Sequence, residues 1–391
     1  MGRAELFQEI RKMRFESVYT DWRARRLTQE QAAMVLGVCA RTFRRQINRF
    51  EENGVEGLLD KRLTQIPSRR APVDELFAVC DTYKKRYQGW NVAHFHSRYK
   101  SNGGQRSYTW VKNTLQSNGL VNKASKKGKH RKRREPAPIP GMMLHQDASN
   151  HQWVEGKKWD LVVTMDDATN EHYSMFFVYE EGTASSFRGV KDVISKRGLF
   201  SSLYTDRGSH YWYTPQEGGK VSKTNLTQFG RAMASLAIQM IPSYSPQARG
   251  RSERAFRTHQ DRLPRELAAN GITTMEQANQ YLAEVYLPAF NAEFMRTASE
   301  KGTAFMQWVG SDLDDILCEQ YERTVNPDNC VSFEGKKLQI PPDKYRCHYV
   351  KARVRVHKYI DGSLAVFHGP RKLADYDSKG KLKEGQSQNA A

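Results

Sequence analysis

Apolar side chains recur at helical spacing over the N-terminal part of the chain. This spacing predicts one helix over residues 3–26 and a second helix that begins after Thr28. Thr28 and Gln31, three residues later, match a capping box, in which each side chain binds the other residue's backbone N–H. Gly37 is expected to break the second helix, so that a third runs over about 40–50. Two helices joined by so short a turn are typical of a helix-turn-helix.

The third expected helix carries a polar and basic face. Its side chains suit phosphates and base edges in a DNA major groove, and the candidates are Arg41, Thr42, Arg44, Arg45 and Asn48. We therefore interpret residues 1–62 as a helix-turn-helix DNA-binding domain. An ordinary helical hairpin with a solvated basic face is the alternative.

A second helical segment, 73–121, follows a proline-containing linker at 63–72. We interpret it as a second, helix-turn-helix-like DNA-binding domain, with Lys112 as a candidate DNA contact. His94 and His96 match the His-hydrophobic-His pattern of nickases that use a tyrosine nucleophile. Side chains two residues apart on a helix diverge, however, so we expect both histidines at the surface or in a DNA groove.

The next segment, 122–141, is a basic linker that ends in prolines, which force extended backbone. A tether of this composition would neutralise DNA phosphates without reading base sequence. Its candidate DNA contacts are Lys129, Arg131, Lys132, Arg133 and Arg134. A plain solvated linker is the alternative.

From residue 142 the pattern becomes that of an α/β domain. Three strands with short turns come first, and helices and strands then alternate up to a long helix at about 247–269. This order predicts a mixed sheet flanked by helices. Further helical spacing over 274–322 extends the predicted core to 142–322.

Short alternating strands return at the C-terminal end of the chain. They include a turn at Asp361-Gly362 and predict a small β-barrel over 328–376, followed by a disordered tail at 377–391. The chain is thus expected to be multidomain. Its parts are N-terminal all-α helix-turn-helix units, a central α/β mixed sheet flanked by helices, and a C-terminal small β-barrel.

The charge of the chain indicates the class of its partner. The formal net charge of +19 favours a polyanion, and nucleic acid is the commonest one.

Other sequence features exclude several classes of partner and cofactor. The chain holds no run of about 18 apolar residues, so no membrane is expected to be involved. The five scattered cysteines indicate neither a disulfide framework nor a zinc site, which favours a reducing compartment such as the cytoplasm. No phosphate-binding Gly-Lys-Ser/Thr pattern occurs, so no nucleotide cofactor is expected.

Three carboxylates occupy places where such sheets gather functional groups. Asp147 falls in the first strand, Asp206 ends the fourth, and Glu253 begins the long helix. Asp206 could instead cap a turn, and Glu253 could pair with an arginine four residues away. Asp147 is harder to explain in this way, because Asp is disfavoured inside strands. Two rival acids, Asp166 and Asp167, precede a turn that we expect them to stabilise.

The segments around these acids carry a resemblance to a known family. HQDAS, YTDRGSHY and SYSPQARGRSERAFR resemble, in order, the ribonuclease H-like core of retroviral integrases and of bacterial insertion-sequence transposases of the DDE class. LTQEQAAMVLGVCARTFRR and EGLLDKR resemble the front half of the same transposases, so the resemblance covers about positions 1–320. The last two acids are 47 residues apart, which exceeds the usual integrase spacing, and 213–225 reads as an inserted loop.

The resemblance implies a function and a cofactor. It makes Asp147, Asp206 and Glu253 both catalytic residues and ligands of two Mg²⁺ ions, for which Mn²⁺ can substitute. Two such cations ~4 Å apart activate a water molecule and stabilise the leaving oxygen in phosphodiester cleavage. The implied protein binds transposon inverted-repeat ends and target double-stranded DNA as a homo-multimer, and cleaves and transfers strands.

Neighbouring side chains complete the hypothesis. We expect Arg249, Arg251 and Arg254 to hold phosphates, and Arg257 and Gln260 to face the DNA near the metals. The alternative is a sequence-specific DNA-binding regulator whose ribonuclease H-like core does not cut.

Overall fold

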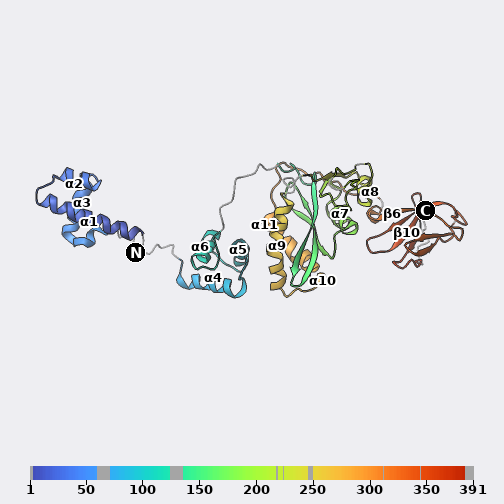
Figure 1. Cartoon of the computed structure of the whole chain (residues 1–391), viewed down its shortest axis with the longest axis horizontal. Helices are drawn as coiled ribbons and strands as arrows, with labels where there is room; N and C mark the ends of the chain where they lie inside the picture. Colours follow the sequence, from blue (N-terminus) through green and yellow to red (C-terminus); the bar gives the residue numbers. More distant parts are fainter. Residues whose placement is uncertain are drawn as a thin grey trace. The chain divides into compact units, whose positions relative to one another are not determined.

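The computed structural model divides the chain into two compact units, Met1–Arg86 and Tyr87–Ala391, and each is described by itself (Figure 1). The residues described are 3–59, 71–123, 135–216, 219–222, 224–244, 250–310, 312–343 and 345–383, with side chains from residue 8 onward. The basic linker residues Lys129 to Arg134, Arg249 and the predicted tail beyond 383 lie outside them.

The first unit contains the predicted helix-turn-helix. Its described helices are α1 (Arg3–Arg23), α2 (Gln29–Leu36), α3 (Ala40–Asn53), a short 3₁₀ turn (Gly54–Leu58) and α4 (Val73–Arg86). Helices α1 to α3 share a core that includes the fully buried Phe43 and Ala32. Side chains at 43 and 47 face this core, which leaves the opposite face of α3 to solvent.

The turn between α2 and α3 forms as the sequence predicts. Gln31 N–H donates to Thr28 Oγ1 at 3.2 Å, and Thr28 N–H donates to Gln31 Oε1 at 2.8 Å, so the capping box is confirmed. Gly37 ends α2 with φ at +67°, in the left-handed region that glycine adopts at little cost. Helix α3 then starts three residues later.

The second unit opens with two short helices, α5 (Val92–Ser101) and α6 (Tyr108–Ser117). The prediction that His94 lies at the surface is wrong, because the side chain is buried. Its ring stacks on Trp90 with centroids 3.9 Å apart, and its Nε2 lies 2.6 Å from Glu266 Oε1. Packing of α5 against the long helix of the core takes this residue out of solvent.

The core of the second unit is a five-stranded mixed sheet in the order β3-β2-β1-β4-β5. The first three strands pair antiparallel, and β4 and β5 join β1 in parallel. This mixed sheet confirms the predicted central architecture. The strands are β1 (Leu144–Val154), β2 (Lys157–Asp166), β3 (His172–Val178), β4 (Ser202–Thr205) and β5 (Gln239–Pro242).

Helices cover both faces of this sheet, and α9 and α7 lie on opposite sides of it (Figure 1). One apolar layer joins α7 and α8 to residues such as Leu144 and Leu203. The other joins α9 to Trp153, Leu161 and Phe177. The helices are α7 (Thr183–Arg197), α8 (Gln228–Ser235), α9 (Ser252–Ala269), α10 (Met275–Tyr281), a π-helical turn (Leu282–Tyr286) and α11 (Leu287–Phe294).

The C-terminal part differs from the sequence prediction in two ways. The helical extension ends at Phe294 and gives way to irregular chain with one 3₁₀ turn at Leu313–Asp315. The predicted small β-barrel is not confirmed, because the described strands form a four-stranded sheet, β11-β10-β9-β6, and a separate hairpin, β7-β8. These strands are β6 (Glu319–Thr324), β7 (Cys330–Phe333), β8 (Lys336–Gln339), β9 (Arg353–Lys358), β10 (Leu364–His368) and β11 (Arg371–Tyr376).

The sheet and the hairpin nevertheless share one core. Val331 and Leu338 of the hairpin pack with Val356 and Val366 of the sheet. Two packed layers therefore bury the apolar faces without ring closure. The expected turn at Asp361-Gly362 joins β9 to β10, and Gly362 has φ at +81°.

Candidate active site

Strand register brings two of the three predicted carboxylates together. Strands β1 and β4 pair in parallel, with Leu144 opposite Leu203 and His145 opposite Tyr204. Continuing this register by two residues places Asp147 opposite Asp206. Laterally paired residues on adjacent strands carry side chains on the same face of a sheet, about 5 Å apart. The two acids are thus neighbours although many residues separate them in sequence.

Backbone amides orient both carboxylates. Asp206 follows the last residue of β4, and its Oδ1 accepts the Gly208 N–H at 2.8 Å. Asp147 is 8% exposed, and its Oδ1 accepts the Ala148 N–H at 3.0 Å.

Helix α9 brings the third acid to the same face of the sheet. Gln260 Nε2 donates to Ser149 Oγ at 2.9 Å, and Ser149 shares the face of Asp147 because side chains alternate along a strand. Glu253 lies seven residues before Gln260 and therefore on the same side of the helix, about 10 Å nearer the helix start. Its side chain is exposed.

The start of α9 is held near the start of β1. Arg251, the residue before the helix, pairs with Asp167, and the Asp167 N–H donates to Met143 O at 3.0 Å. Since this contact lies on one side of Glu253 and the Gln260 contact on the other, Glu253 lies alongside the part of β1 that carries Asp147.

These three acids do not form a closed cluster in the structure. Within the described residues, no group of three or more His, Cys, Asp or Glu side chains is arranged to hold a metal ion. Asp147 and Asp206 still fit a divalent cation, because they are adjacent hard oxygen donors whose mutual repulsion a cation would relieve. Glu253 would join them from the first turn of α9.

A buried tyrosine reports how close the surrounding charges are. The Tyr211 hydroxyl lies 3.3 Å from Gln146 Oε1 and 3.4 Å from Glu181 Oε1. Burial raises the pKa of Tyr211 well above its usual value, and the negative charges of Glu181, Asp147 and Asp206 raise it further. Glu181 is therefore a fourth carboxylate beside the site. Its position in the loop between β3 and α7 carries no sequence signal, whereas Gln146 and Tyr211 belong to the HQDAS and YTDRGSHY segments that hold the two aspartates.

His210 also lies beside this group. A β-carbon placed on Gly208 would be 3.0 Å from both Asp206 Oδ1 and His210 Cε1, so these two atoms are at most about 6 Å apart. His210 Nε2 lies 3.4 Å from Glu181 Oε1, although the contact lacks hydrogen-bond geometry. The structure thus places His210 near Asp206, as the YTDRGSHY segment suggests.

The rival acids have different roles from one another. Asp166 is fully buried, and its Oδ1 accepts the N–H groups of Ala168 and Thr169 at 2.9 Å. It stabilises the turn as predicted. Asp167 turns the other way, toward His145 and Arg251.

The predicted DNA contacts differ in exposure. On α3 all five are exposed: Arg41, Thr42, Arg44, Arg45 and Asn48. On α9, Arg254 and Arg257 are exposed, whereas Arg251 is paired with Asp167 and Gln260 with Ser149. Lys112 on α6 is half-buried.

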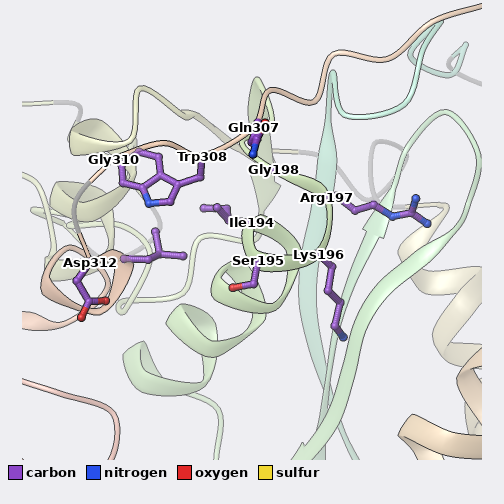
Figure 2. Close-up of a pocket in the computed structure, with 10 residues that line it drawn as sticks. Ile194, Ser195, Lys196, Arg197, Gly198, Gln307, Trp308, Gly310 and Asp312 are labelled. Atoms are coloured by element: carbon purple, nitrogen blue, oxygen red, sulfur yellow. The ribbon is translucent and has the colours of Figure 1, made fainter.

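A cavity of about 570 Å³ lies elsewhere, between the end of α7 and the chain at 307–310 and 312–313. Trp308 and Ile194 face each other across it, and Arg197 projects away (Figure 2). Asp312 is the one acid among its lining residues, so this hollow offers no set of carboxylates for metal chemistry.

The chain is similar to known DNA-binding and DNA-transposing proteins. A winged helix-turn-helix family model matches residues 23–73, the region of α2 and α3. A putative transposase of Sinorhizobium fredii, y4bF, is 28% identical over 353 residues, covering 87% of this chain and 75% of its own length. The transposase of insertion sequence IS1202 from Streptococcus pneumoniae is 25% identical over 400 residues, covering 90% and 84%.

These relatives confirm the resemblance to insertion-sequence transposases. Among solved structures, a chain of a simian T-cell lymphotropic virus intasome aligns over 78% of this chain and 98% of its own, with 14% identity and a TM-score of 0.34. The HTLV-2 integrase catalytic core solved with magnesium aligns over 38% and 89%, with 16% identity and a TM-score of 0.28.

A search of the described helices for a membrane span found none that is both long and apolar enough.

Proposed function

We propose that the protein is a DNA transposase that cleaves transposon ends and transfers strands by metal-dependent phosphodiester chemistry. The observation that carries this proposal is the β1–β4 register, since continuing it two residues past its last pair would bring Asp147 beside Asp206 on the face of the sheet that α9 packs against. The similarity to two transposases over most of the chain supports the same reaction class.

In this mechanism Asp147, Asp206 and Glu253 would hold the metal ions. Bound Mg²⁺ would activate water and stabilise the leaving oxygen. The sheet fixes the first two carboxylates, and the Gly208 amide orients Asp206. The Gln260–Ser149 hydrogen bond holds α9 against β1, so that Glu253 can meet them. The exposed Arg254 and Arg257 are placed to contact the DNA backbone.

We further propose that residues 1–62 bind the inverted-repeat ends through α3, with the exposed Arg44 among its base contacts. Pairing of two ends would require a homo-multimer. The sequence-specific regulator is distinguished from the transposase by one property, which is whether the bound ends are cut.

The test uses duplex DNA from the regions flanking the gene, incubated with wild type, Glu253→Gln or Glu276→Gln, in Mg²⁺ or EDTA. Glu276 is the matched control, since it is exposed in the first turn of α10. We expect metal-dependent cuts at repeat ends with wild type and Glu276→Gln, and at least about a 10³-fold slower reaction with Glu253→Gln. Glu253→Gln should bind the DNA normally, because a metal ligand and not a phosphate contact is removed.

Equal loss of binding and cutting in Glu253→Gln would contradict the assignment of Glu253. Tight binding of paired ends by wild type without any cut would favour the regulator.

End recognition gives a second prediction. Arg44→Ala should weaken binding to the repeat by about 1–3 kcal/mol and relax base preference at one position. Arg49→Ala is the matched control, because Arg49 is exposed on the same helix but lies about 140° around it from Arg44. Fluorescence anisotropy with repeat and scrambled duplexes measures both. Equal losses on the two duplexes would show that Arg44 contacts phosphate only.

A further inference from the structure

One buried carboxylate joins three segments beside the candidate site. Asp167 is 1% exposed, and its Oδ2 accepts the Ala137 N–H at 2.7 Å. Its Oδ1 lies 2.7 Å from His145 Nε2 and also accepts from Arg251 Nη1. The chain entering the core, strand β1 and the start of α9 therefore meet at this side chain.

Asp167 is negatively charged in this environment. Burial alone would raise the pKa of Asp167, but the donors His145, Ala137 and Arg251 hold it well below its usual range. A buried charge of this kind is stable only while its partners remain in place. The contact therefore restrains both the Arg251 side chain and the segment that follows β2.

Two partners of Asp167, His145 and Arg251, lie close in sequence to candidate metal ligands. His145 lies two residues before Asp147 on the same face of β1, and Arg251 lies two residues before Glu253. Arg251 is the N-cap residue of α9, and its side chain pairs with Asp167 and does not cap the helix. The Arg251–Asp167 pair ties the start of α9 to the turn after β2, and the Gln260–Ser149 hydrogen bond ties the helix to β1 further along.

We propose that Asp167 is a positioning residue that holds Glu253 over Asp147, and that Arg251 serves this carboxylate and not a DNA phosphate. The catalytic meaning of the contact rests on the proposed transposase function. The contact itself can be tested in the full-length protein without DNA.

The first experiment measures hydrogen exchange of the amides at the start of α9 that have a partner within the helix, beginning with Ala255, whose N–H donates to Arg251 O at 3.0 Å. It compares wild type, Arg251→Gln and Arg254→Gln. Arg254 is the matched control, because it is an exposed arginine in the same helical turn. Loss of the Asp167 contact should speed exchange of these amides about tenfold or more in Arg251→Gln, and Arg254→Gln should leave exchange unchanged. Unchanged exchange in Arg251→Gln would overturn the proposal.

The second experiment measures cleavage against Mg²⁺ concentration, together with DNA affinity at several salt concentrations. Arg251→Gln should raise the Mg²⁺ needed for half-maximal cleavage about 10–100-fold, with unchanged DNA affinity. Arg254→Gln should weaken DNA binding and reduce its salt slope by about 1. A reduced salt slope in Arg251→Gln, with normal metal dependence, would make Arg251 a phosphate contact and refute the positioning role.

A double variant separates this contact from a general structural effect. Asp167→Asn should reproduce the metal dependence of Arg251→Gln, and combining the two should add little, because both remove one interaction. Fully additive effects would contradict the coupling. If Asp167→Asn fails to fold, the Arg251→Gln measurements still decide. If wild type cuts no DNA, the proposed function fails, and hydrogen exchange alone decides whether the contact holds α9.

Discussion

Asp147→Asn is expected to slow end cleavage at least about 10³-fold while making the metal-free protein more stable. Both effects follow from the closeness of Asp147 to Asp206 that the β1–β4 register implies when it is continued two residues past its last pair. Adjacent carboxylates repel each other, so neutralising one should add about 1 kcal/mol to the unfolding free energy in EDTA. The same change removes a ligand for the metal.

Thermal unfolding with and without Mg²⁺ separates these contributions. Wild type should be stabilised by Mg²⁺ because the ion binds the folded state, and Asp147→Asn should lose most of that stabilisation. Asp192→Asn is the control, since the Asp192 carboxylate on α7 accepts from Ser174 and an amide oxygen can still do so. If Asp147→Asn retained the Mg²⁺ stabilisation of wild type, Asp147 would not be a metal ligand.

Local sequence patterns predicted the elements of the core well. Three strands, a helix, a strand, a helix, a strand and the long helix occur in the expected order, and Thr28 and Gln31 form the expected capping box. These features depend on residues close in sequence, namely alternation, helical spacing, caps and turns. Strand order then follows from few choices, because a parallel strand must return by a crossover helix.

Long-range contacts could not be read in the same way. The divergence of side chains two residues apart on a helix predicts His94 at the surface or in a DNA groove, but the side chain is buried by its contacts with Trp90 and Glu266. Asp166 and Asp167 are adjacent and chemically identical, yet one closes a turn and the other binds Arg251, 84 residues away. Which neighbour a buried acid finds depends on tertiary packing.

The C-terminal strands show a related limit. Alternation predicted the individual strands and the Asp361-Gly362 turn, but ring closure depends on hydrogen bonds between distant edges. The described strands instead bury their apolar sides by packing the β7-β8 hairpin against the sheet.

Acidification is expected to loosen the contact between α9 and β3, because two neutral histidines are buried there. His172 Nδ1–H donates to Asn170 O at 3.0 Å, so its Nε2 accepts from His259 Nε2–H at 3.1 Å. The Tyr286 hydroxyl donates to His259 Nδ1 at 3.1 Å. This chain of donors holds both rings in their neutral form. Burial lowers the pKa of His172 to about 4, and burial followed by His172 and Arg262 lowers that of His259 well below its usual value.

The lowered pKa values of His172 and His259 determine how stability changes with pH. Above pH 6.5, the ordinary pKa of histidine, His172 and His259 are neutral in the folded and in the unfolded chain. In that range the two histidines contribute no pH dependence to stability. As the pH falls below that value, both histidines become protonated in the unfolded chain but stay neutral in the folded chain. The free energy of unfolding therefore decreases. At pH 5.5 each histidine costs about 1.4 kcal/mol, and ordinary carboxylates, with pKa values near 4, contribute little.

Hydrogen exchange of β3 and α9 peptides at pH 7.5 and 5.5, corrected for intrinsic rates, measures this loss locally. His259→Gln keeps hydrogen-bonding groups but cannot titrate, so it should lose about half of the pH dependence. His348→Gln, at an exposed position of the C-terminal part, should behave as wild type. Identical pH dependence in wild type and His259→Gln would contradict this prediction. It would show that the His259 ring is not held in its neutral form by the hydrogen bonds described above. Since Glu253 lies six residues before His259 on the same helix, the loss should also slow end cleavage below pH 6.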